Sequence, residues 1–327
     1  MNWARWACSF VVGFAVSFPA MAAENDPPIL RVYGSKATLE LGPVLYAAEN
    51  YSQGKVTVTH GGVVNLFFPV DKAPPGGDGG RADAATNSST WALRVSQEHP
   101  DTRIIMTVAE GVYRLLGRRS VGIAKVADLK GKSIGTIAFT SSAYYLNRVL
   151  ATAGLSEDDV KVVHFTKTSD ISKAMIDKKI DAMSIWEPEI DIAKEALKSD
   201  AIEFQPPGLY RELFNLNSTA ANLADPVKRK RIVAFVRDIM RASEKAKAAP
   251  KEIWPLISKA SGYDQAIIAH AWPHHRFPGA LVPNMLDIIT KEEVWLAKQQ
   301  NGRPARTRGQ LAPLIDGSIV KEARALR

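Results

Sequence analysis

Short apolar strands alternate with amphipathic helices in the middle of the chain, and this pattern constrains the fold more than any other feature. The predicted strands are SIGTIA (133–138), VKVVHF (160–165), AMSIW (182–186) and IEF (202–204). Between them, apolar residues recur at the spacing of one helix face, as Leu146, Val149 and Leu150 do after the first strand. Because strands joined by helices in this order favour right-handed crossovers, we predict an α/β fold with a parallel sheet.

Polar residues follow three of these strands, at the points where the chain turns into the next segment. They are Thr140-Ser141-Ser142, the segment TKTSD (166–170) and Trp186-Glu187-Pro188. In open α/β sheets, ligands bind outside the carboxyl ends of the strands. A helix that begins there offers free backbone N–H groups and the positive end of its dipole to an anion. We interpret the hydroxyl cluster as a binding site, and helix capping alone remains the alternative.

The pattern changes after residue 205, which indicates a second structural unit around the first. The segments ILRVYG (29–34), KVTVTH (55–60) and TRIIMTVA (102–109) are predicted strands, LFNLNSTAA (213–221) is a predicted connecting strand, and the remainder is mostly helical. A chain of 327 residues is too long for one compact core. We therefore predict two lobes, each a central sheet flanked by helices, with two crossover strands at a hinge. The first lobe comprises 24–115 and 211–327, and the inserted second lobe comprises 116–210.

The first 23 residues, MNWARWACSFVVGFAVSFPAMAA, have the layout of a secretory signal peptide. Arg5 is their only charge, a short apolar stretch follows, and small residues surround the expected cleavage point after Ala22 or Ala23. We therefore predict export to the periplasm, with a short membrane anchor as the alternative. Removal of this segment removes Cys8, the only cysteine, so we predict neither a disulfide framework nor a thiolate nucleophile.

The formal net charge of +8 favours anionic small molecules or surfaces as partners. The densest basic run, KRKR (228–231), opens a segment in which Val233, Val236 and Ile239 follow helical spacing. We interpret these charges as the solvated face of a helix, and we predict no nucleic-acid partner.

Several motifs in the second predicted lobe occur in an order and at spacings that are typical of one protein family. DLKGK (128–132) precedes the first strand, a serine-rich turn with a tyrosine follows it, and Asp181-Ala182 leads to Trp186-Glu187-Pro188. The chain resembles the solute-binding proteins of ABC importers, in the branch for aliphatic sulfonates, taurine, nitrate and thiamine-pyrimidine precursors. GRAD (80–83) is similar to a motif that precedes the first-lobe cleft residues in that family.

The resemblance implies a type II periplasmic-binding-protein fold whose two lobes close over a small solute. It also implies partners, namely a membrane permease and its ATPase, and a monomeric protein without a cofactor. The implied ligand-binding residues of the second lobe are Thr140, Ser141, Ser142, Tyr144, Trp186 and Glu187. Those of the first lobe and the crossings are Thr38, Thr86, Asn87, Ser88, Arg114 and Asn217.

Each of these side chains also has an ordinary structural explanation. Trp186 can stack on a ring or cover an alkyl chain, or it can be a core residue at a strand end. Glu187 can bond a ligand amine or hydroxyl, or complement the dipole of the helix that follows. Arg114 can clamp a carboxylate or sulfonate, or lie at the surface. Asn87 can bond a polar solute, or form a turn in NSST.

One first-lobe segment departs from the family pattern. The helix expected between the second strand and GRAD is replaced by HGGVVNLFFPVDKAPPGGDGG (60–80), whose Pro- and Gly-rich end is predicted to be an irregular loop. The first-lobe half of the cleft therefore cannot be assigned by the resemblance alone.

The histidines of HAWPHHRF (270–277) raise the question of a metal site. Pro273 interrupts the helix that an i, i+4 pair of His270 and His274 would need, and no acidic residue is close in sequence. His275 completes the cluster, which we interpret as part of an aromatic-rich loop. The sequence contains neither G-x-S-x-G nor H-E-x-x-H, so we predict no metal and no enzymatic activity.

The sequence thus predicts a receptor that captures a small anionic or zwitterionic organic solute, such as a sulfonate, a carboxylate or a pyrimidine. Two alternatives stay open: a periplasmic sensor that reports its bound state to a signalling partner, and an enzyme acting on a thiamine-precursor-like metabolite. The fungal thiamine-precursor relatives use a cysteine-rich motif, which a chain without cysteine after its leader lacks.

Overall fold

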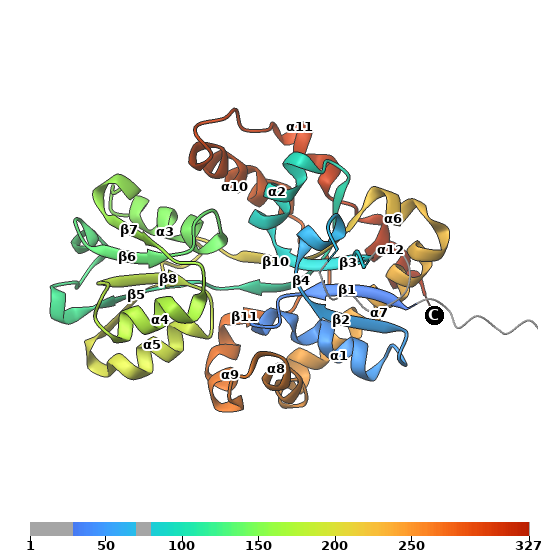
Figure 1. Ribbon diagram of the computed structural model, residues 1–327, viewed down its shortest axis with the longest axis horizontal. Coiled ribbons are helices and arrows are strands. Elements are labelled where there is room, and N and C mark those ends of the chain that lie inside the picture. Colours follow the sequence, from blue (N-terminus) through green and yellow to red (C-terminus); the bar gives the residue numbers. More distant parts are fainter. Residues whose placement is uncertain (1–28, 70–79, 327) are drawn as a thin grey trace, which may run out of the picture.

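The computed structural model describes residues 29–69 and 80–326. Figure 1 shows two lobes side by side, each with a central sheet flanked by helices. The α/β fold with two lobes that the sequence predicts is therefore confirmed. The predicted signal peptide (1–23) and nearly all of the Pro/Gly-rich loop (73–80) lie outside the described residues.

The sheet of the first lobe has the strand order β11-β4-β10-β3-β1-β2. Its strands are β1 (Leu30–Gly34), β2 (Val56–His60), β3 (Ala84–Ser88), β4 (Thr102–Gly111), β10 (Glu212–Thr219) and β11 (His275–Arg276). Strand β1 pairs in parallel with β2 and β3, whereas β10 is antiparallel to β3 and β4. The carboxyl ends of β1, β2 and β3 therefore meet at one edge of the sheet.

The sheet of the second lobe has the order β7-β6-β8-β5-β9. Its strands are β5 (Arg114–Arg118), β6 (Ser133–Thr136), β7 (Lys161–His164), β8 (Ala182–Ile185) and β9 (Ala201–Phe204). Strand β6 pairs in parallel with β7 and β8, as predicted. The second-lobe sheet is not purely parallel as predicted, because β5 lies between β8 and β9 and is antiparallel to both. Strand β9 itself runs in the same direction as β8.

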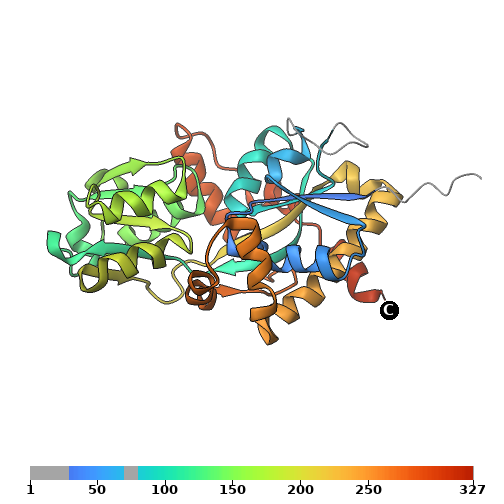
Figure 2. The same ribbon diagram turned by 60° about the horizontal axis from the view of Figure 1, so that its bottom comes forward.

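The chain passes between the lobes twice, from β4 to β5 and from β9 to β10. Figures 1 and 2 show the second lobe joined to the first through these segments. At the first passage, the backbone N–H of Val112 donates a hydrogen bond to the carbonyl of His274 at 2.8 Å. The predicted connecting strand is β10, which returns the chain into the centre of the first sheet.

Helices cover both sheets. The second lobe contains α3 (Ser141–Ala151), α4 (Thr168–Ile176) and α5 (Glu189–Leu197). The first lobe contains α1 (Gly42–Asn50), α2 (Ser89–Glu98), α6 (Ala220–Ala224), α7 (Pro226–Ala248), α8 (Trp254–Ser261), α9 (Gln265–Ala271), α10 (Met285–Gln299), α11 (Arg308–Leu311) and α12 (Ser318–Ala325). The 3₁₀ helices are η1 (Leu39–Leu41), η2 (Val63–Leu66), η3 (Arg119–Val121), η4 (Val126–Leu129), η5 (Glu157–Asp159), η6 (Lys198–Asp200), η7 (Pro250–Glu252), η8 (Trp272–His274) and η9 (Ala312–Leu314).

Helix α7 carries the basic run of residues 228–231. Its N-cap, Asp225, accepts hydrogen bonds from the backbone N–H groups of Val227 and Lys228, at 2.8 and 3.1 Å, which satisfies two of the free donors of the first turn. The apolar face of α7 packs against α1 and α12, as the helical spacing predicts. Within 29–69 and 80–326, no helix is both long and apolar enough to cross a membrane.

Side chains bridge the lobes away from the two crossing segments. The hydroxyl of Tyr263 donates to Glu189 of α5 at 2.9 Å, and the indole N–H of Trp295 donates to Glu157 at 3.3 Å. These contacts join the C-terminal helical part of the first lobe to the second lobe, so the arrangement of the lobes depends on more than the crossing strands.

Candidate functional site

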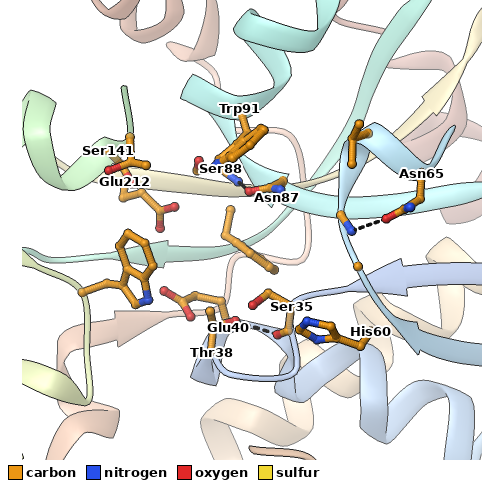
Figure 3. A pocket seen from close by; sticks show the side chains of 16 residues that line it. Ser35, Thr38, Glu40, His60, Asn65, Asn87, Ser88, Trp91, Ser141 and Glu212 are labelled. Atoms are coloured by element: carbon orange, nitrogen blue, oxygen red, sulfur yellow. Dashed lines mark hydrogen bonds between the residues drawn. The ribbon is translucent and has the colours of Figure 1, made fainter. Parts of the chain in front are cut away.

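A cavity of about 310 Å³ lies between the lobes. Its walls combine apolar and polar side chains from both sheets, as Figure 3 shows. The lining residues are Ser35, Thr38, Glu40, His60, Gly61, Gly62, Val64, Asn65, Asn87, Ser88, Trp91, Thr140, Ser141, Trp186, Glu212 and Phe214.

The strand ends explain why these residues meet. In the first lobe the lining begins just after β1, at the end of β2 and at the end of β3. In the second lobe it begins after β6, at Thr140 and Ser141, and after β8, at Trp186. Both lobes thus present the carboxyl ends of parallel strands, the place where open α/β sheets bind ligands.

The segment that replaces the expected first-lobe helix forms part of this wall. The backbone N–H of Gly62 donates to Asn65 Oδ1 at 2.9 Å (Figure 3). His60 Nδ1 accepts from the backbone N–H of Lys36 at 3.3 Å. A Cβ atom on Gly62 would lie 2.5 Å from Nδ2 of Asn87. A larger residue at this position would displace the side-chain amide of Asn87 from its place in the wall.

The hydroxyl cluster at the start of α3 is bonded mostly to itself. The Ser142 hydroxyl lies 2.8 Å from that of Thr140 and 3.0 Å from that of Thr136, and it is fully buried. The Ser141 hydroxyl lies 2.8 Å from the phenol oxygen of Tyr113. These bonds hold the first turn of α3 against the cavity, so that its backbone N–H groups rather than its hydroxyls are the groups left for an anion.

Two carboxyl groups face the cavity, Glu40 from η1 and Glu212 from the start of β10 (Figure 3). Each residue is only 3% exposed. Burial raises the pKa of Glu212 well above its usual range, and the charges of Glu40 and Glu292 raise it further. No lysine or arginine is among the lining side chains of the described residues.

The structure brings half of the predicted ligand residues to the cavity wall. They are Thr38, Asn87, Ser88, Thr140, Ser141 and Trp186. The other half lie outside the lining, namely Thr86, Arg114, Ser142, Tyr144, Glu187 and Asn217.

Those outside the lining have structural partners. The ring of Tyr144 packs against Tyr210 and Trp295, with ring centroids 5.1 and 5.3 Å apart. The Asn217 side chain donates to the carbonyl of Ala85 on β3 and to that of Asn215 on its own strand, and Thr86 is fully buried within β3.

Arg114 is the centre of a buried ion cluster. Its guanidinium donates to Asp191 at 2.6 Å, to Glu203 at 2.9 Å and to Glu187 through both Nε and Nη2. Burial raises the pKa of Glu187 to about 7, although the charge of Arg114 opposes this shift. With three carboxylates around it and 2% exposure, Arg114 orders the strand ends of the second lobe and does not point into the cavity.

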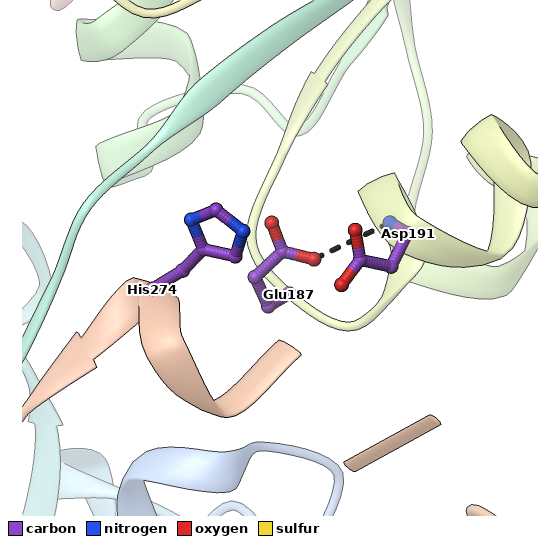
Figure 4. A group of neighbouring side chains, drawn as sticks. All are labelled: Glu187, Asp191 and His274. Atoms are coloured by element: carbon purple, nitrogen blue, oxygen red, sulfur yellow. Dashed lines mark hydrogen bonds between the residues drawn. The ribbon is translucent and has the colours of Figure 1, made fainter. Parts of the chain in front are cut away.

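Within the described residues, this cluster contains the one group of side chains whose potential ligand atoms lie close enough together to hold a metal ion. Ligand atoms of Glu187, Asp191 and His274 all lie within 4.8 Å of one another (Figure 4). Both carboxylates already pair with Arg114, whose positive charge would repel a cation. The other histidines have separate partners, since His270 pairs with Glu195 at 2.7 Å. We therefore assign no metal to this cluster.

Sequence reasoning missed several lining residues. The sequence analysis assigned no role to Trp91, Phe214, Glu40 or Glu212, all of which line the cavity. The signal that could have found His60, Gly61 and Gly62 is their position at the end of a predicted strand.

The fold is that of two-lobed periplasmic binding proteins. It superposes on the aliphatic sulphonate binding protein SsuA from Escherichia coli with a TM-score of 0.68, over 87% of this chain and 92% of that chain, at 17% identity. It superposes on the alkanesulfonate-binding protein SsuA from Xanthomonas axonopodis pv. citri, bound to MOPS, with a TM-score of 0.65, over 89% and 99%, at 20% identity. The desulfurization enzyme DSZB shares the fold, with a TM-score of 0.61 at 12% identity over 91% and 99%.

The sequence comparisons identify the family. The model described as NMT1/THI5 like matches residues 77–253, more than half of the chain, so the chain belongs to the NMT1/THI5-like family. A putative binding protein of Brucella abortus is 42% identical over 74 residues, a match that spans 23% of this chain and 23% of the length of that relative. The resemblance noted in the sequence is thus confirmed for family and fold.

Proposed function

We propose that the protein captures a small polar organic solute between its two lobes and delivers it to a membrane permease and its ATPase. The observation that carries the proposal is the cavity itself, which both lobes line with side chains at the carboxyl ends of parallel strands. Its size suits a small metabolite, and its mixture of indole rings with a few polar groups is typical of small-molecule sites.

The proposed mechanism is closure of the lobes about the two crossing segments. We propose the boundaries 24–115 and 211–327 for the first lobe and 116–210 for the second. A solute that touches Trp186 in one lobe and Asn87 in the other stabilises the closed arrangement by its contacts with both.

The polar groups of the cavity favour a zwitterionic solute over a purely anionic one. The first turn of α3 offers backbone N–H groups to a negative group. The carboxyl groups of Glu40 and Glu212 favour a positive one. A sulfonate or carboxylate that also carries a basic nitrogen satisfies both walls.

The remaining parts of the proposal concern location and assembly. We propose export to the periplasm by means of residues 1–23, which lie outside the described residues, and action as a monomer without a cofactor. The family membership and the fold of periplasmic binding proteins support this location.

The test is a thermal-shift and calorimetric screen of sulfonates, carboxylates, amines and pyrimidines against the parent protein and Trp186→Ala. We expect at least one class to raise the melting temperature of the parent and Trp186→Ala to weaken that solute about tenfold or more, because the indole wall is lost. Trp254→Ala is the matched control, since Trp254 is also partly buried but lies on α8, outside the cavity lining. Equal losses of affinity in both variants would contradict the proposal.

An enzyme is the second candidate, because the desulfurization enzyme DSZB has the same fold. A turnover assay with any solute that binds separates the two candidates: a receptor returns the solute unchanged, whereas an enzyme consumes it. A sensor would also return its solute unchanged, and it would be recognised by a signalling partner in place of the permease.

A further inference from the structure

The cavity wall holds two acidic side chains, and no lysine or arginine is among its described lining residues. Glu40 and Glu212 come from different elements, η1 and β10, and each has an Oε2 atom with no hydrogen-bond partner in the described part of the chain. Both atoms are buried, so bulk water does not supply the missing hydrogen bond to either of them. Buried carboxyl oxygens without donors are costly, and their presence at a cavity indicates that a donor arrives from outside.

The charged side chains behind the cavity wall do not donate a hydrogen bond to these free carboxyl oxygens. His275 approaches Glu40 at 3.5 Å through Nε2, but it meets Oε1 and not the free Oε2. Burial opposes the charged form of His275, yet the hydrogen bond and charge of Glu40 outweigh it and raise the pKa of His275. The positive charge of His275 therefore balances the negative charge of Glu40. Glu212 is left without a positively charged partner in the described part of the chain.

The surroundings of Glu212 are acidic or neutral. The charges of Glu40 and Glu292 raise the pKa of Glu212. The charge of Glu212 in turn raises the pKa of Tyr113 and of Tyr210. The neighbouring Arg211 pairs with Glu110 at 3.3 Å, not with Glu212. Arg94 lies 4.2 Å over the ring of Trp91, a lining residue, and is itself outside the lining. No cation among these described residues is placed to balance Glu212.

We propose that Glu40 and Glu212 form a subsite for a positively charged nitrogen of the solute, a primary ammonium or an amidinium. This inference deepens the proposed function and rests on it. The charged N–H groups supply the donors that the two free carboxyl oxygens lack, and charge-assisted bonds of this kind are stronger than neutral ones. The indole of Trp186 in the same cavity favours a cation as well, through the negative face of its ring.

The subsite couples binding to release of a proton. In the empty protein, burial and the charges of Glu40 and Glu292 raise the pKa of Glu212 well above its usual range. An ammonium beside Glu212 favours its ionised form and lowers this pKa, so binding releases protons to the buffer wherever Glu212 is protonated in the empty protein. Over that range of pH the affinity for a cation rises with pH.

The experiment uses pairs of probes that differ only in an amino and a hydroxyl group, or in an amidine and an amide. The pairs are β-alanine with 3-hydroxypropanoate, benzylamine with benzyl alcohol, and benzamidine with benzamide. Calorimetry at pH 7 in phosphate and in Tris, which differ in their heats of protonation, counts the protons released. We expect the basic member of a pair to bind about tenfold or more tightly and to release more protons than its neutral partner.

Two variants locate the effect. Glu212→Gln keeps the size of the side chain and removes its ionisation, so we expect it to fold, to lose the preference for the basic probe and to lose the proton release. Glu292→Gln is the matched control, because Glu292 is also a buried carboxyl but lies outside the lining. We expect it to keep the preference for the basic probe but to release fewer protons, because its charge contributes to the raised pKa of Glu212.

The outcomes separate this inference from the proposed function. Hydroxyl probes that bind as tightly as their basic partners, or an unchanged preference in Glu212→Gln, would overturn the subsite and leave solute capture standing. If no probe binds, native mass spectrometry of the purified protein decides. A retained solute with a basic nitrogen supports the subsite, a retained solute without one overturns it, and no retained solute overturns the proposed function itself.

Discussion

Replacing the buried Glu292 by glutamine should change the pH dependence of stability. Glu292 lies on α10, is fully buried, and accepts hydrogen bonds from the hydroxyls of Ser89 and Tyr210, at 2.9 and 3.0 Å. Burial raises its pKa from 4.5 to about 7, although the two hydrogen bonds oppose the shift. A glutamine oxygen can accept the same two bonds, so the substitution removes the ionisation and keeps the contacts.

The sign and size follow from the linkage between proton binding and folding. Between about pH 4.5 and 7, the folded state keeps a proton on Glu292 that the unfolded state has lost, so the stability of the parent falls as pH rises. Each pH unit of this interval is worth about 1.4 kcal/mol, which gives a loss of about 3 kcal/mol by pH 7. Below the interval both states are protonated, and this loss is absent.

Urea unfolding of the parent and Glu292→Gln from pH 4.5 to 7.5 measures the effect. The difference in unfolding free energy should move in favour of the variant by about 3 kcal/mol over this range. Glu244→Gln, the same change at a side chain that is 72% exposed, controls for the substitution itself. A difference between parent and Glu292→Gln that stays constant with pH would refute the reasoning.

Two further predictions concern the ion cluster and the cavity wall. Arg114→Ala leaves Glu187 and Asp191 buried without their partner, so urea unfolding should show a loss of about 3–5 kcal/mol, and a loss below about 1 kcal/mol would contradict the role given to the cluster. Gly62→Ala places a Cβ 2.5 Å from Nδ2 of Asn87, so calorimetry should show a loss of affinity of about tenfold or more for any solute that binds the parent. An unchanged affinity would mean that the solute does not reach this wall.

Hydrophobic periodicity was sufficient to predict most of the second lobe. Strands β6, β7 and β8 bury apolar residues between helices, and such alternation specifies both the strands and their parallel pairing. The pairing of β9 could not be predicted, because it depends on β5. The sequence of β5, RLLGR, begins and ends with arginines that are buried only because carboxylates from other elements surround them.

The sequence predicted which strand ends contribute to the candidate site. It did not predict which side chains at those ends point into the cavity. Thr140, Ser141 and Trp186 follow strands and reach the cavity. Ser142 and Glu187 are each adjacent in sequence to one of these residues but lie outside the lining, since neighbouring residues point in different directions. Sequence alone does not show which of two neighbours faces the cavity.

The meeting of Glu40 and Glu212 in one cavity wall could not be predicted from the sequence, for a different reason. The positive net charge suggested an anionic partner, but charge at the surface does not determine charge in a cavity. Glu40 and Glu212 are far apart in the chain, and only the return of β10 into the first sheet brings them to the same space.

A crystal structure of the protein with its bound solute tests the central claim most directly. We expect the solute in the cavity between the lobes, in contact with Trp186 of the second lobe and Glu40 of the first. A solute bound on another surface, or one that touches a single lobe only, would contradict the account.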